Sequence, residues 1–131
     1  MKPLQYLSPE WTQELRARLQ QEITPAKGNA TASIVFRHLN VPGGGERYLY
    51  FNITNGMLRA LESGEGAGPQ AEFVISGDYQ AFAQVLKGQI DPARALKSGR
   101  LRLQGNMMRA LRLLPLIEKI VFEASDIPTT F

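Results

Sequence analysis

Few residues in this chain have side chains that could carry out chemistry, and their spacing does not form a catalytic set. The chain has one histidine, His38, and no cysteine, so thiolate catalysis and cysteine metal sites are excluded. A serine nucleophile would need His38 as its base, and no serine has the strand–turn–helix surroundings of a nucleophile elbow. The acidic residues are scattered, and Glu62 and Glu65 only flank a glycine-rich turn. We therefore expect no catalytic residue, no metal ion and no cofactor, and an enzyme is the least favoured class.

Two glycine-rich stretches resemble phosphate-binding loops in composition, but their surroundings predict loops between strands. Residues 43–45 and 64–68 each lead into a predicted strand rather than a helix. A phosphate-binding loop needs a helix N-terminus behind it, and a P-loop needs Lys followed by Ser or Thr. Neither condition is met, so nucleotide binding at these loops is not expected.

One stretch of the chain is basic and contains no acidic residue. Six arginines and lysines lie between Pro92 and Ile117, in a chain whose net charge is +3. Such residues either form a solvated face or contact phosphates and carboxylates. Nucleic acid is a weak candidate, because aromatic residues make up only 8% of the chain and do not alternate with these bases. The residues expected to contact a lipid headgroup or an anionic membrane are Arg94, Lys97, Arg100, Arg102, Arg109 and Arg112.

The elements that must position these residues are predicted from caps and periodicity. Ser8-Pro9 is typical of a helix start, and apolar residues then recur every four positions from Trp11 to Ile23. Asn55-Gly56 predicts a type I′ hairpin turn. Alternating residues predict strands over 33–39, 47–54, 57–63, 71–76 and 100–105. Capping residues predict further helices over 79–87, 92–98 and 107–124, and the remaining tail is expected to be irregular.

The final predicted helix is apolar around most of its circumference. A helix packed on one sheet needs an apolar stripe of only somewhat more than about 100°. The excess predicts a second apolar contact, with another helix, a partner protein or a ligand. Met107 and Met108 suit an adaptable surface because methionine is flexible, and Pro115 is expected to kink the helix. This helix is therefore a candidate cavity wall.

The length and composition fit a single domain spanning residues 1–131, in which apolar residues make up 44% of the chain. No apolar run approaches the roughly 20 residues that cross a bilayer, and the N-terminus does not have the pattern of a signal peptide. A cytoplasmic location is therefore the expectation.

The stretch LKGQIDPARALKSGRLRLQGN, residues 86–106, resembles the central signature of the sterol carrier protein-2 family. Its glycines, its Asp-Pro helix start and its apolar spacing match together. Asn106 replaces the usual aspartate, and the terminal residues Thr-Thr-Phe differ from the peroxisomal tripeptide of eukaryotic members. The resemblance implies a five-stranded sheet covered by helices around an apolar tunnel that binds fatty acids, acyl-CoA esters, phospholipids or sterols.

We therefore expect an α+β fold with a mostly antiparallel five-stranded sheet covered on one face by helices, and a lipid-like ligand bound for transfer or presentation. The alternative is an accessory or scaffold domain for a partner enzyme that acts on lipids or quinone intermediates. We expect the cavity to lie beside Met107, Leu111 and Leu114. The full set of residues expected to line it is Trp11, Leu15, Phe36, Phe51, Phe73, Ile75, Phe82, Leu86, Ile90, Leu96, Leu101, Leu103, Met107, Leu111 and Leu114. Of these, Leu86, Ile90, Leu96, Leu101 and Leu103 are implied by the resemblance.

Overall fold

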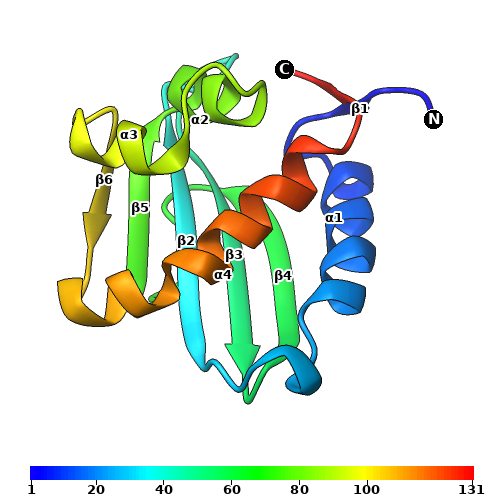
Figure 1. The fold of residues 1–131 in the computed structure, drawn as a ribbon. Coiled ribbons are helices and arrows are strands. Elements are labelled where there is room, and N and C mark those ends of the chain that lie inside the picture. The colour runs from blue at the N-terminus through cyan, green and yellow to red at the C-terminus, as the bar shows by residue number, and fades with distance from the viewer.

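A five-stranded sheet forms the centre of the computed structural model, which describes residues 1–131 (Figure 1). Its strands are β2 (Ala32–Leu39), β3 (Arg47–Thr54), β4 (Met57–Glu65), β5 (Phe73–Asp78) and β6 (Leu101–Gln104). They lie side by side in the order β4-β3-β2-β5-β6. Only β2 and β5 are parallel, and the other neighbours are antiparallel, so the predicted sheet is confirmed.

Helices cover one face of this sheet. They are α1 (Pro9–Glu22), α2 (Tyr79–Leu86), α3 (Pro92–Lys97) and α4 (Met107–Ser125). Figure 1 shows α4 running diagonally across the sheet, with α1 along one side and α2 and α3 near one end. Ser8, Asp91 and Asn106 cap the starts of α1, α3 and α4 by accepting a backbone N–H through their side chains. The order of helices and strands that the sequence predicts is therefore confirmed.

The core lies between the sheet and these helices. Ile34, Phe51 and Ile53 point from the sheet and are fully buried, while Trp11 and Leu15 meet them from α1 and are also fully buried. The alternation in β2 and β3 and the four-residue spacing in α1 therefore identify the inward faces correctly. Asn55 and Gly56 have φ of +51° and +78°, as the predicted turn requires.

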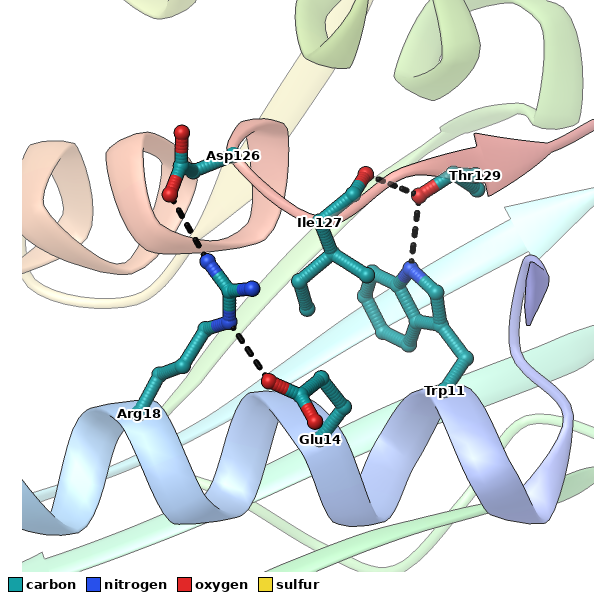
Figure 2. Close-up of polar contacts among 6 residues, drawn as sticks. All are labelled: Trp11, Glu14, Arg18, Asp126, Ile127 and Thr129. Carbon is teal, nitrogen blue, oxygen red and sulfur yellow. Dashed lines mark hydrogen bonds and ion pairs between the residues drawn. The ribbon is translucent and has the colours of Figure 1, made fainter. Parts of the chain in front are cut away.

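The two ends of the chain pair with each other, which the sequence does not predict. β1 (Leu4–Gln5) and β7 (Thr129–Thr130) form a parallel two-stranded sheet. The Trp11 indole Nε1 donates a hydrogen bond of 3.0 Å to Thr129 Oγ1, and Arg18 bonds to Asp126 at 2.7 Å (Figure 2). The expectation of an irregular tail is wrong here because two-residue strands leave no alternation to read. A short 3-10 helix, η1 (Pro25–Lys27), follows α1 and is also absent from the prediction.

Candidate functional site

An apolar pocket lies in the core, between the sheet and all four helices. Its volume is about 30 Å³, and none of its lining residues carries a charge. The lining residues are Tyr6, Trp11, Leu15, Phe36, Leu49, Ile75, Phe82, Val85, Leu86, Pro92, Leu96, Leu101, Ile117, Ile120, Val121 and Ala124. The floor comes from β2, β3, β5 and β6, and the walls come from α1, α2, α3 and α4.

The structure brings many of the expected lining residues together in this one pocket. These are Trp11, Leu15, Phe36, Ile75, Phe82, Leu86, Leu96 and Leu101. Phe51 and Phe73 are buried in the core without lining the pocket. Leu103 is partly buried and outside the lining, and Ile90 lies in a groove beside the pocket.

The apolar pocket does not lie beside Met107, Leu111 and Leu114, contrary to the expectation. Met107 and Leu111 are exposed, and Leu114 is only partly buried. The buried stripe of α4 runs through Ala110 and continues at Leu113, Ile117, Ile120 and Ala124. Since α4 has apolar residues on both sides, the pattern could not show which side faces the sheet. The pocket instead borders the second half of the helix.

Several lining residues were missed by the sequence reasoning. Ile117, Ile120, Val121 and Ala124 follow the three-and-four spacing of one helical stripe, but the second apolar side of α4 has similar spacing, so periodicity alone could not select them. Leu49 lies on the alternating face of β3 and could have been found from that pattern. Val85 follows Phe82 by three residues on α2 and could have been found in the same way, whereas Tyr6 and Pro92 lack such a signal.

The two aromatic side chains in the lining that carry a polar atom already have hydrogen-bond partners. His38 Nδ1 lies 3.0 Å from the backbone oxygen of Phe36, so it carries the ring hydrogen and donates it there. The Tyr6 hydroxyl then donates to His38 Nε2 at 2.8 Å, and Trp11 donates to Thr129. Burial lowers the pKa of His38 to about 3, so the imidazole is neutral at physiological pH. The pocket wall therefore offers a ligand no free hydrogen-bond donor from Tyr6 or Trp11.

A surface groove between α3 and α4 adjoins the pocket. Val85, Pro92 and Val121 line both the pocket and the groove. The exposed ring of Phe122 lines the outer part of the groove. The pocket and the groove are therefore separated only by these three side chains.

The six basic residues expected at a headgroup or membrane do not line the apolar pocket. Arg109 pairs with Glu72, and Arg100 bonds to Gln84. Arg112 lines a separate cleft between α4 and η1. The others are exposed and make no ion pair: Arg94, Lys97 and Arg102.

Two other kinds of feature are absent from the structure. No group of three or more histidine, cysteine or acidic residues is placed to hold a metal ion. None of the helices has the length and apolar character needed to cross a membrane.

Comparisons with known proteins agree with this architecture. The family model described as the SCP-2 sterol transfer family matches residues 8–118. No curated protein matches the sequence. A crystal structure of sterol carrier protein 2 is 22% identical, with a TM-score of 0.79, and the match covers 94% of this chain and 99% of that one.

Two further solved structures share the fold. A Thermus thermophilus protein, described as possibly a sterol carrier protein, is 20% identical with a TM-score of 0.77, covering 99% of this chain and 94% of that one. A palmitated sterol-carrier-like protein of Aedes aegypti is 17% identical with a TM-score of 0.53, covering 84% of this chain and 94% of that one.

Proposed function

Because this chain belongs to the SCP-2 sterol transfer family, we propose that it binds a hydrophobic molecule in the apolar pocket and holds it for transfer or presentation. The ligand classes to consider are a fatty acid, an acyl-CoA, a phospholipid and a sterol-like lipid. The family is described by sterol transfer and not by a reaction, so the proposal includes no reaction and no cofactor.

The chemistry of the pocket wall is the observation that supports this proposal. Every lining side chain is uncharged, and the polar atoms of Tyr6 and Trp11 are already bonded to His38 and Thr129. Such a wall stabilises a hydrocarbon by removing it from water and provides nothing that would transfer a proton or hold a charge. A ligand with a polar head would therefore place its tail inside the pocket and its head in water.

The pocket must enlarge to accept such a ligand. Its volume of about 30 Å³ has room for only about two water molecules. We infer that α3 is the wall that moves, because this short helix contributes Pro92 and Leu96 to the lining. Gly88 and Gly99 flank it, with φ of +75° and +80° and open space around each Cα. Glycine tolerates such angles at low cost, so both ends of the segment can change direction.

The energetics allow binding without a directed polar contact. Burying one methylene contributes about 0.8 kcal/mol, so a 16-carbon chain offers roughly 10 kcal/mol before costs. Ordering the chain and opening the pocket offset part of this gain. A micromolar dissociation constant corresponds to about −8 kcal/mol and is within reach.

Native mass spectrometry of gently purified protein, followed by organic extraction of the same sample, tests the proposal directly. We expect extra mass that matches a discrete lipid. Palmitate is the first ligand to add to delipidated protein, since a relative of the same fold is described as palmitated. Trp11 is the only tryptophan and lines the pocket, so its fluorescence should change on binding. A bare mass together with no response to palmitate, palmitoyl-CoA, a phospholipid or a sterol would contradict the proposal.

A matched pair of variants locates the ligand. Leu96 and Leu103 are both partly buried leucines, but only Leu96 lines the pocket. Leu96→Asn should weaken palmitate binding about tenfold, since it introduces an unpaired polar group into an apolar site. Leu103→Asn should leave binding close to that of the unaltered protein. Equal affinity in the two variants would place the ligand elsewhere.

The accessory role, the cellular location and the role of the basic residues remain predictions. The accessory or scaffold role for a partner enzyme would show as a bare pocket together with a stable complex in light scattering. The cytoplasmic location is untested. For the six basic residues between Arg94 and Arg112 we propose contact with anionic lipid headgroups or an anionic membrane surface.

A further inference from the structure

Helix α4 carries apolar side chains on two opposite sides, and only one side is covered. Met108, Leu111 and Phe122 are 66%, 62% and 68% exposed, and Met107 is 59% exposed at the edge of the same side. Positions 108, 111, 115 and 122 are spaced by three, four and seven residues, so they form one line along the helix, and the exposed Glu118 lies on the same side between Leu111 and Phe122. We call Met107, Met108, Leu111 and Phe122 the outer α4 face. Exposed large apolar side chains gathered on one side of a helix indicate a binding surface.

A positively charged cleft runs along the flank of this face. Arg112 and Lys119 are seven residues apart on the neighbouring stripe of α4, and both line the cleft together with Lys27 of η1. Glu22 is the only carboxylate in the lining and already accepts bonds from Lys27 at 2.9 Å and Lys119 at 3.4 Å. Arg112 makes no ion pair. The cleft therefore carries a surplus of positive charge.

We propose that the outer α4 face docks on an anionic bilayer, with its apolar side chains among the acyl chains and Arg112, Lys119 and Lys27 at the lipid phosphates. Apolar residues bordered by basic ones are the arrangement that holds helices at the surface of anionic membranes. Flexible methionine side chains adapt to a disordered lipid phase. An antiparallel two-fold contact with a second copy of this chain fits less well, because it would bring the basic flanks of two helices together.

The position of Phe122 connects this surface to the proposed carrier function. Only the purpose of docking depends on that function. Phe122 belongs to the outer α4 face and also lines the groove that adjoins the pocket. Docking would therefore place the groove beside the bilayer, where a hydrocarbon chain could pass between them without crossing water.

Vesicle sedimentation with the purified full chain tests the proposal. The vesicles are phosphatidylcholine alone, and phosphatidylcholine mixed with phosphatidylglycerol in equal parts. We expect sedimentation with the mixed vesicles only, and weaker sedimentation as salt is raised. Met108→Glu with Leu111→Glu should weaken it about tenfold or more, because the charges cannot enter the acyl region. Arg112→Gln should weaken it about fivefold, the effect of one basic residue near the surface.

Two control variants have the same chemistry on a different element. Met57→Glu changes an apolar residue that is 42% exposed on β4, and Arg59→Gln removes an exposed arginine that makes no ion pair on the same strand. Both should sediment like the unaltered protein. The proposal is overturned if the protein does not sediment, if both kinds of vesicle bind equally, or if the α4 variants match the controls.

Two further measurements distinguish membrane docking from self-association and from ligand binding in the pocket. Light scattering should show that the α4 variants and the unaltered protein have the same mass, and a dimer that the variants dissociate would overturn docking in favour of a second copy. Palmitate binding should persist in the α4 variants. Vesicle binding without palmitate binding would contradict the pocket function alone, whereas palmitate binding without vesicle binding would overturn docking alone.

Discussion

His38 should make the stability of the fold depend on pH in a range where few other groups titrate. Burial lowers its pKa from 6.5 to about 3 in the folded protein, so the unfolded chain takes up a proton first as the pH falls. Stability is therefore complete above pH 6.5 and decreases below it by about 1.4 kcal/mol per pH unit. Between pH 7 and pH 5 the free energy of unfolding should fall by about 2 kcal/mol.

Urea unfolding, followed by circular dichroism and by Trp11 fluorescence at several pH values, measures this slope. Lys27 and Arg37 lower the pKa of Glu22 and Glu46 from 4.5, so the stability that these carboxylates contribute is lost mainly below pH 4.5, outside the range from pH 7 to pH 5. The variant His38→Gln should be less stable at pH 7 but nearly constant between pH 7 and pH 5. If the two proteins lose the same stability across that range, or if the His38 ring titrates near pH 6.5 in the folded state, the reasoning is refuted.

Two other substitutions test the packing. Thr129→Val removes the acceptor of the buried Trp11 indole, so the free energy of unfolding in urea should fall by about 1–3 kcal/mol. Thr130→Val changes an exposed neighbour in the same strand and should have no effect, so equal values for the two variants would contradict the hydrogen-bond argument. Gly105→Ala should lower the melting temperature because φ is +136° and the new Cβ would lie 2.6 Å from a phenylalanine ring carbon. Gly43 also has a positive φ, but nothing lies within 4 Å of the Cβ that alanine would add. Gly43→Ala should therefore lower the melting temperature less than Gly105→Ala.

The sequence predicted those parts of the fold that local patterns determine. Ser8, Asp91 and Asn106 mark helix starts because a capping side chain acts within one turn of the chain. Alternation over the eight residues of β3 is long enough to define its inward face. Both signals depend on neighbours in sequence, and both were confirmed.

The parts that were missed depend on contacts between distant residues. Met108 and Ile117 are both apolar and both lie on α4, and only the position of the sheet makes one exposed and the other buried. The hydrogen bond between Tyr6 and His38 joins residues 32 apart, and no local pattern announces it. The sequence therefore predicted that the pocket wall is apolar, but it could not predict which residues of α4 face the pocket.

The pairing of β1 with β7 has a consequence for the order of events during synthesis. Trp11 and Thr129 are 118 residues apart, and the strands that join beside them are separated by nearly the whole chain. Contacts of such long sequence separation form late, because a large loop must close first. A chain that emerges from the ribosome with its N-terminus first must hold Trp11 without Thr129, and β1 without β7, until residues 129–130 have been added. The pairing that fixes the Trp11 side of the cavity is therefore expected to form last, after the strands and helices between the two ends of the chain.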